Sequence, residues 1–517
     1  MFFKNDVIRM VYSVPSRLFS SPCHVPEQSL KKVRPFDEIP GPSGRYSIPF
    51  IGQVFHYEPF GQYLPSTFTD FLRDLHCQYG QIVRQRAGMD WMVFLFNPVD
   101  IQQIMFHYEK YPLRPTPHLM YSYAKRKNVP LSMAFLNKEK WVEARKPIQE
   151  VILKPYVVSK YFSEFTDIVD DFLMCRIDRD NRIADVLEEL TRLTMENSGI
   201  LCFNRRLGSF SHDRQELLSN IKDVHAYLGQ SFDIFPWYCL FPTNFYLDFE
   251  RAYDTVRNTT RQSLNECLET INFKRGMISR GLQDFTFLEK LILDHRMTHD
   301  SVESAITDMF IAGTDATANA LSFVLYHLAK NPLVQDRLYE EITRCCTNGL
   351  ICESSFADMP YLKACIKESL RLVPPLRDGV RRHVEKDTVV AGFHIPKGTT
   401  LVFCNSIISS DKNYFPEAHE YKPERWLRNS PLRRNIHPFA VLPYGFGRRN
   451  CIGQRFADLQ MRIFIVKLLQ NFSLSLAEKE EQLPYKYTIF AAPSKKFSLQ
   501  LEKRIKRQDD VRCVAKG

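Results

Sequence analysis

The stretch YGFGRRNCIGQR, residues Tyr444–Arg455, places one cysteine in a glycine-rich turn beside three arginines. Neighbouring positive charge lowers the pKa of a thiol, which predicts that Cys451 is either a nucleophile or a metal ligand. Gly445 and Gly447 permit tight turns just before the cysteine. The turn therefore predicts a functional thiol, and the motifs elsewhere in the chain distinguish the two kinds of chemistry.

The composition of the 517-residue chain favours one large, mostly helical domain. Hydrophobic residues make up 44% and aromatic residues 13%, which is enough for a large buried core. Length alone would suggest about two to four domains, but the chain has no Gly/Ser-rich or acidic linker, no internal repeat and no low-complexity tract. The net charge of +10 is modest, and no nucleic-acid-binding module is recognisable. We therefore expect no nucleic-acid partner, while a smaller basic face for an acidic protein stays open.

The first residues of the chain are typical of a mitochondrial transit peptide. Lys4, Arg9 and Arg17 are spaced among aromatic and aliphatic residues, and Asp6 is the only acid in residues 1–22. No run of about 20 apolar residues is present that would span a bilayer. We expect a transit peptide and flexible leader over residues 1–33, a folded domain over 34–503 and a polar tail over 504–517; an untargeted leader is the alternative. The thirteen cysteines contain no C-x-x-C pair, which agrees with a reducing compartment.

The longest apolar stretch, DSVESAITDMFIAGTDATANALSFVLYHLAK (300–330), predicts a helix about 45 Å long that crosses a whole domain. Asp300 and Glu303 fit a capping box at its start, and Asn331-Pro332 ends it. A glycine inside a helix costs about 1 kcal/mol, and a buried carboxylate needs a partner or a function. Gly313 and Asp315 are therefore candidate functional residues, with a structural aspartate as the alternative.

Three further motifs accompany the helix and the cysteine turn. CIKESLRLVPP carries Glu368 and Arg371 at i, i+3, YKPERWL carries Arg425, and KWVEARKP places Trp141 one helical turn before Arg145. Alone, a Glu–Arg pair at this spacing indicates an ordinary surface salt bridge.

Together the five motifs, in the order W-x-x-x-R, A-G-x-D, E-x-x-R, P-E-R-W and cysteine turn, resemble the cytochrome P450 family from Ile39 to about Leu499. The resemblance implies a mainly α (α+β) fold, with haem b between the long helix and the cysteine loop. Cys451 would be the axial thiolate of the haem iron, which favours O–O cleavage. Glu368, Arg371 and Arg425 would form a buried structural triad.

The same resemblance assigns further residues to the cofactor. Gly445 and Gly447 would allow close approach to the porphyrin, and a helix beginning near Gly453 would favour the thiolate. Guanidinium groups match carboxylates bidentately and would bind the haem propionates. The positions that match the family's propionate contacts are Trp141, Arg145, Arg449 and Arg382, with Arg381 as the alternative to Arg382.

AGTDAT (312–317) resembles the oxygen-activation segment A-G-x-D-T-T of the family. By this resemblance Gly313 leaves room for dioxygen and Asp315 relays protons through water. The usual threonine is replaced by Ala316. Thr317, Thr314 or a hydroxyl of the substrate would then have to take its place.

The helix that carries Lys363 and Lys367 at i, i+4 resembles the ferredoxin-docking helix of the mitochondrial branch, and Arg448 and Arg455 flank Cys451. Two solvated lysines are the alternative. A small acidic ferredoxin would be attracted to such a face. The resemblance implies a monooxygenase that hydroxylates C–H bonds, with electrons from NADPH through ferredoxin reductase and ferredoxin.

The substrate is predicted to be lipophilic. FDEIPGP (36–42) and the aromatic insert at 231–247 resemble arthropod hormone-making members, so we expect a steroid or sterol, with ecdysteroid-type hormone biosynthesis favoured. The expected location is the matrix side of the inner membrane, as a peripheral protein. Four side chains of the insert would either touch that membrane or pack under the helices: Phe232, Phe235, Trp237 and Phe241. A detoxifying monooxygenase, a haem-thiolate isomerase and a haem sensor without an electron donor are the alternatives.

Overall fold

The computed structural model describes residues 33–504, apart from residues 65–66, 107–110, 233, 276–284, 347–348, 377–379, 435 and 479–481 and the side chains of 212 and 272–275. Of the predicted leader and tail, all but Val33 and Arg504 lie outside the described residues. The transit peptide therefore stays a prediction.

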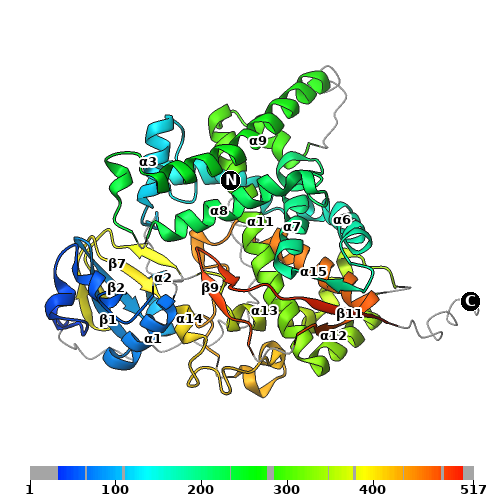
Figure 1. Cartoon of the computed structure of the whole chain (residues 1–517). Helices are drawn as coiled ribbons and strands as arrows, with labels where there is room; N and C mark the ends of the chain where they lie inside the picture. Colours follow the sequence, from blue (N-terminus) through cyan, green and yellow to red (C-terminus); the bar gives the residue numbers. More distant parts are fainter. Residues whose placement is uncertain are drawn as a thin grey trace, which may run out of the picture.

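Helices dominate the structure, as the sequence predicts, and Figure 1 shows them gathered beside a smaller region of strands. The helices are α1 (Phe68–Tyr79), α2 (Pro98–Phe106), α3 (His118–Lys127), α4 (Lys138–Ile152), α5 (Pro155–Ser159), α6 (Phe162–Cys175), α7 (Val186–Phe203), α8 (Gln215–Gln230), α9 (Asn244–Arg275), α10 (Phe287–Ile292), α11 (His299–Lys330), α12 (Pro332–Cys345), α13 (Pro360–Leu372), α14 (Asn405–Ile408) and α15 (Gln454–Asn471).

The strands form small sheets. The largest has the order β1-β2-β7-β4, in which β2 and β7 are parallel and the other neighbours antiparallel. Gly88, at φ 62°, lies in the turn between β1 and β2, where the sequence predicts two short strands. The strands are β1 (Ile82–Ala87), β2 (Asp90–Leu95), β3 (Arg182–Ile183), β4 (Arg381–His383), β5 (Thr388–Val390), β6 (Phe393–Ile395), β7 (Thr400–Phe403), β8 (Phe472–Leu476), β9 (Tyr485–Tyr487), β10 (Ala491–Pro493) and β11 (Leu499–Lys503).

The long central helix, α11, packs against α7, α8, α9, α13 and α15, and its apolar side chains belong to the main hydrophobic core. Its end at Lys330 before Pro332 confirms the sequence prediction. The predicted capping box is wrong: the side chain of Thr298 accepts the hydrogen bond of Ser301 N–H and caps the helix. Glu303 instead pairs with Arg257 and Arg261 of α9. A tertiary contact has therefore taken the carboxylate that the local pattern assigned to the cap.

The aromatic insert between α8 and α9 includes one short turn of helix, Trp237–Cys239. Phe232, Phe235, Trp237 and Phe241 are between 41% and 55% exposed. They therefore do not pack under the helices as one of the two predictions had it. Among the residues that the model describes, we find no helix with the length and apolarity needed to span a bilayer.

Candidate active site

The middle of α11 presents small side chains to an internal cavity. Ala312 is exposed and Ala316 is half-buried, although both lie near the centre of a helix that is otherwise largely buried. Residues four apart share one face of a helix, so the two alanines lie on the same side. Ala312 lines a cavity of about 320 Å³, a volume within the usual range of small-molecule sites.

The cavity wall is mostly apolar and comes from distant parts of the chain. Asp308 is a polar member of the wall; its Oδ2 accepts a hydrogen bond from Met133 N–H at 2.8 Å, and burial raises its pKa to about 7. His225 of α8 and Arg114 are further polar members. The apolar side chains include Pro117, Met120, Phe135, Leu228, Phe232, Ile311 and Phe490.

The cysteine turn is held by its backbone. Cys451 N–H donates to the carbonyl oxygen of Tyr444 at 2.8 Å, and the side-chain hydroxyl of Tyr444 donates to Asp458 of α15 at 2.7 Å. The thiol is accessible, yet protein surrounds it on nearly all sides, so it faces an interior space rather than the outer surface. The turn therefore fixes the sulfur at the wall of an internal site.

Burial raises the pKa of the Cys451 thiol, while the Gly453 N–H, Arg145 and Arg114 act in the opposite direction. The prediction that neighbouring positive charge leaves this pKa lowered is wrong in its net direction, because desolvation outweighs the arginines. A thiolate here needs a cation bound to the sulfur, which favours a metal ligand over a free nucleophile.

The backbone conformation and the free space around the turn both bear on why glycine occupies its positions. Gly445 and Gly447 have φ of 69° and 72°, a region that strongly favours glycine. A Cβ built on Gly447 or Gly453 would meet no described protein atom within 4 Å. Packing within the chain therefore does not require glycine at 453, which directly precedes α15, near the helix start that the sequence predicts.

Three arginines near the cysteine turn donate to uncharged groups; Arg145 and Arg449 are buried and Arg114 is half-buried. Arg449 donates to the carbonyl oxygens of Pro112 and Leu136 and to the amide oxygen of Asn137, and its guanidinium lies 4.3 Å from the Trp141 ring centre. Arg145, on α4, donates to Gln149 and Asn450, and Arg114 donates to the Arg449 carbonyl oxygen. Within the described ranges, Nη1 of Arg449 is buried without a hydrogen-bond partner. Unsatisfied buried donors of this kind indicate a missing acceptor.

These arginines also disfavour one another's charge. Burial, followed by Arg114, Arg382 and Arg145, lowers the pKa of Arg449 to about 9, and burial followed by Arg114 lowers that of Arg145 to about 10. A guanidinium keeps its proton even so. Four cationic side chains thus lie close together in the interior, and among the described residues no carboxylate forms an ion pair with Arg114, Arg145 or Arg449. The cluster fits a ligand that carries more than one carboxylate.

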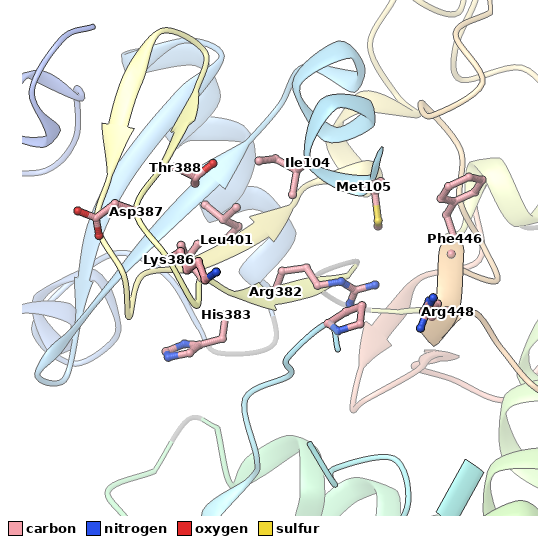
Figure 2. A pocket seen from close by; sticks show the side chains of 13 residues that line it. Ile104, Met105, Arg382, His383, Lys386, Asp387, Thr388, Leu401, Phe446 and Arg448 are labelled. Atoms are coloured by element: carbon pink, nitrogen blue, oxygen red, sulfur yellow. The ribbon is translucent and has the colours of Figure 1, made fainter. Parts of the chain in front are cut away.

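Arg382 and its neighbour Arg381 point to different places. Arg382 is buried on β4 and lines a cavity of about 180 Å³ between β7 and the cysteine turn, which Phe446 and Arg448 line from the other side (Figure 2). Arg381 instead lies 5.2 Å from the ring centre of Phe232, at the larger cavity. This placement favours Arg382 over Arg381 as the member of the arginine cluster.

The triad predicted from E-x-x-R and P-E-R-W is formed and fully buried. Glu368, Arg371 and Arg425 are each 0% exposed. Arg371 donates to both carboxylate oxygens of Glu368 at 2.9 and 2.8 Å, and Arg425 Nε donates at 3.1 Å. Arg371 also donates to carbonyl oxygens of residues 409, 418 and 420. The network therefore fixes α13 to the segment that leads to the cysteine turn.

The outer face behind the cysteine turn is basic. Lys363 of α13, Arg448 and Arg455 are exposed. Lys367 is half-buried, and its ammonium lies 3.9 Å from the Trp426 ring centre. Burial, followed by Arg433 and Lys363, lowers the pKa of Lys367 to about 8. Lys363 is thus the more available of the two predicted docking lysines.

The oxygen-activation segment is arranged differently from the sequence prediction. Asp315 is 6% exposed and its Oδ1 accepts from Asn319 Nδ2 at 3.0 Å. A Cβ on Gly313 would meet Ser198 Oγ of α7 at 3.1 Å, which indicates a packing reason for the glycine. Thr317 is 5% exposed and lies off the face of Ala312 and Ala316. The catalytic assignments of Gly313 and Thr317 stay predictions.

Two functional candidates were missed from the sequence. Arg114 belongs to the arginine cluster. His225 lies 3.0 Å from Asp315, although it precedes Asp315 by 90 residues in the chain. Neither residue lies in one of the five motifs, and no local spacing singles it out. Only the fold brings them to the site.

A thiol at an internal wall, a helix face of small residues beside a cavity and a cluster of arginines in the interior together define a site for a flat, metal-bearing group with carboxylate arms. Haem is such a group, and the residues present fit it. A family model described as Cytochrome P450 matches residues 42–501, and the chain belongs to that family. Members of this family are haem-thiolate monooxygenases, and the protein is an enzyme of this kind.

The chain is similar to curated family members over most of its length. It is 30% identical to the probable cytochrome P450 49a1 of Drosophila melanogaster over 90% of this chain and 81% of that protein. It is 27% identical to the human mitochondrial sterol 26-hydroxylase, over 88% of each chain. It is also 27% identical to the mitochondrial cytochrome P450 302a1 of Drosophila melanogaster, over 91% of this chain and 96% of that one.

Proposed function

We propose that this protein is a mitochondrial P450 that hydroxylates a steroid or sterol with electrons from a ferredoxin. The observation that carries the proposal is an apolar cavity of about 320 Å³ on one side of the arginine cluster and an exposed basic face behind the cysteine turn. Such a cavity suits a rigid lipophilic molecule. A relative named as a mitochondrial sterol 26-hydroxylase supports both the substrate class and the location.

Haem supplies the oxygen chemistry when it is bound. Cys451 is the proposed axial thiolate, because its sulfur is the one thiol that the glycine-rich turn holds at the interior wall. The guanidinium groups of the arginine cluster would bind the two propionates, and the indole of Trp141 packs against Arg449. The residues proposed for the propionates are Arg114, Arg145, Arg382 and Arg449.

The chain's own residues control water and protons on the cavity side. The apolar wall excludes bulk water from the site, which limits side reactions. Asp315, buried on α11, is the proposed acid of a proton relay through water. Asp308 keeps the loop at Met133 closed over α11 through its 2.8 Å hydrogen bond.

The basic face is the proposed docking site of a small acidic ferredoxin. Lys363, Arg448 and Arg455 are exposed and surround the outer side of the cysteine turn. Charge complementarity of this kind raises the rate of encounter and fixes the orientation of the partner. Lys367 contributes less, because its ammonium lies against Trp426.

The exposed aromatic side chains of the insert are the proposed contact with the inner membrane. Phe235, Trp237 and Phe241 are each more than half exposed, next to a cavity that a lipophilic substrate has to enter. Ecdysteroid-type hormones are the first steroids to test, because FDEIPGP and this insert resemble the arthropod hormone-making members.

The test is reconstitution of the purified holoenzyme with NADPH, a ferredoxin reductase and a mitochondrial-type ferredoxin. We expect one steroid or sterol of a panel to produce a substrate-binding spectral shift and a hydroxylated product. Lys363→Glu is expected to raise the KM for ferredoxin about tenfold or more while leaving substrate binding unchanged. Lys125→Glu, an exposed lysine on α3 far from α13 in Figure 1, is the matched control and should change neither.

Other outcomes identify other functions. Turnover with a hydroperoxide alone, without ferredoxin, would replace the proposal by a haem-thiolate isomerase, an alternative that Asp315 and the two lysines disfavour. Many weakly bound drugs and steroids, with none bound tightly, would indicate a detoxifying enzyme. Cys451→Ser should abolish the red-shifted absorbance of the reduced carbon-monoxide complex; retention of that band would refute the thiolate assignment.

A further inference from the structure

The cavity face of α11 lacks a hydroxyl where the related segment carries threonine, since Ala316 occupies that position. The hydroxyl of Thr314 is not a substitute, because it is 0% exposed and donates to the Phe310 carbonyl oxygen at 2.8 Å. Thr317 is 5% exposed and does not share the accessible face. Within the described part of α11, Asp315 therefore has no hydroxyl beside it on the cavity side.

A side chain from another helix occupies this neighbourhood. Nδ1 of His225, on α8, lies 3.0 Å from Oδ2 of Asp315, within ion-pair distance, although the two atoms do not form a hydrogen bond in this structure and Nδ1 has no hydrogen-bond partner among the described residues. Asn319 already binds the other carboxylate oxygen, Oδ1, at 3.0 Å. Each of the two carboxylate oxygens thus faces one nitrogen.

His225 also reaches the substrate cavity. It is 5% exposed, yet it is one of the residues that line the cavity of about 320 Å³. The edge-to-face contact with Phe490, at 5.0 Å between ring centres, holds the imidazole from the opposite wall. The imidazole therefore contacts Asp315 and also forms part of the cavity wall.

We propose that His225 is the proton-transfer partner of Asp315, in the role that the hydroxyl at the Ala316 position has in the related segment. This inference rests on the proposed monooxygenase function. When Asp315 passes a proton on through water, the proton on Nδ1 moves to Oδ2 while cavity water protonates Nε2, so the ring stays neutral. Exchange of the ring proton through water then restores Nδ1–H. Two protons and the two electrons of NADPH are consumed as one oxygen atom enters the C–H bond and the other leaves as water. His225 acts through Asp315 and is a positioning residue.

Imidazole suits this role because it can gain and lose a proton near neutral pH, which an alkyl or amide side chain cannot do. A purely structural tie between α8 and α11 is the competing explanation of the same contact. His225→Asn distinguishes the two, since the amide still donates to Asp315 but carries no transferable proton. Tyr227→Phe, two residues further along α8 and outside the cavity wall, is the matched control.

The first measurement concerns the pair itself and needs no turnover. In ¹⁵N-histidine-labelled holoenzyme, in its diamagnetic carbon-monoxide form, we expect Nδ1 of His225 to carry a proton and its resonance to shift in Asp315→Asn. The resonance is assigned by its loss in His225→Asn, or in His225→Gln if the first variant does not fold. A bare Nδ1, or a resonance unmoved by Asp315→Asn, overturns the proposal.

The second measurement is the partition of NADPH between product and hydrogen peroxide. In His225→Asn the product-forming rate should fall on the order of 100-fold, the lower end of what a positioned proton-transfer group contributes. Peroxide should account for the uncoupled NADPH, the solvent isotope effect should rise, and the substrate-binding spectral shift should persist. If the share of NADPH that forms product and the solvent isotope effect were both unchanged, the contact would be purely structural and the proposal would be wrong.

These outcomes separate the inference from the proposed function. If the wild type does not accept electrons from a ferredoxin, the proposed electron donor fails, and the state of Nδ1 still decides whether His225 carries the proton. If the wild type turns over but His225→Asn is as well coupled as Tyr227→Phe, the function stands and the inference fails.

Discussion

Replacing Glu368 by glutamine should release the haem side of the structure from α13. The carboxylate accepts hydrogen bonds from Arg371 at 2.8 and 2.9 Å, from Arg425 at 3.1 Å, from the Trp426 indole at 2.9 Å and from Lys422 N–H at 3.1 Å. Every one of these groups is a donor. A glutamine presents one oxygen and one NH₂, so some donors would face another donor.

The size of the effect follows from burial and charge. Glu368, Arg371 and Arg425 are all 0% exposed, so Glu368→Gln leaves two guanidinium charges buried without their counter-charge. Removing one partner of a buried ion pair costs about 3–5 kcal/mol. The unfolding entropy is about 2.1 cal/mol/K per residue, or roughly 1 kcal/mol/K for a chain of this length. We therefore expect the Tm of the holoenzyme to fall by roughly 3–5 °C if the chain unfolds as one unit.

Differential scanning calorimetry measures the Tm, and the haem-to-protein absorbance ratio measures retained cofactor. Glu189→Gln is the matched control, because Glu189 binds Arg176 through both oxygens at 2.6 Å but is partly exposed. Because water reaches this pair, its contribution lies nearer to the value of about 1 kcal/mol or less for exposed pairs, so the control should lose less Tm than Glu368→Gln. Equal Tm values and equal haem content for the two variants would refute the argument that burial sets the cost.

Arg449→Lys keeps the charge but loses the planar fork, so haem release to apomyoglobin should become about tenfold faster or more, since a hydrogen bond to a charged group contributes about 1.5–3 kcal/mol; an unchanged rate contradicts the propionate assignment. Burial raises the pKa of Asp308 to about 7, so the folded state holds this proton where the unfolded chain has lost it, and its stabilising effect is lost as pH rises through about 7. Stability should fall with pH between about 4 and 7 by up to about 1.4 kcal/mol per pH unit, and Asp308→Asn should remove that part of the slope in unfolding experiments. Gly313→Ala would place a Cβ 3.1 Å from Ser198 Oγ, so crowding of about 1–3 kcal/mol should exceed the helix-propensity gain of about 1 kcal/mol and lower the Tm. The double variant Gly313→Ala with Ser198→Gly should recover much of that loss. A Tm above that of the wild type for Gly313→Ala alone would show that α7 moves to make room for the added Cβ.

What the sequence predicts well is what local periodicity and short motifs encode. The end of α11 at Lys330 follows from Asn331-Pro332, because proline cannot continue the helix in progress. The start of α11 was misassigned for a non-local reason: Glu303 is bound by Arg257 and Arg261 of α9, which no pattern within 300–303 reveals. Local rules hold at a helix end until a distant charge competes for the capping group.

The site residues also divide into those that short motifs predict and those that only the fold brings together. Cys451, Arg145 and Arg449 lie in motifs and were named from the sequence, whereas Arg114 and His225 lie in none and depend on the fold for their position. The pKa of Cys451 shows a second limit. Nearby arginines are visible in the sequence, but the desolvation that outweighs them depends on how much of the rest of the chain packs around the thiol.

The arginine cluster connects folding to the cofactor. Within the chain itself, burial and then Arg114, Arg382 and Arg145 lower the pKa of Arg449, and burial and then Arg114 lower that of Arg145, so the positive charges of these two residues are disfavoured. A ligand with two carboxylates reverses that sign, because every guanidinium then gains an opposite charge in a medium of low dielectric constant. Binding to the folded state alone adds its free energy to stability. The residues proposed to bind the haem propionates therefore also destabilise the fold when no such ligand is bound, and substitutions in the cluster should change the stability of holoprotein and apoprotein by different amounts.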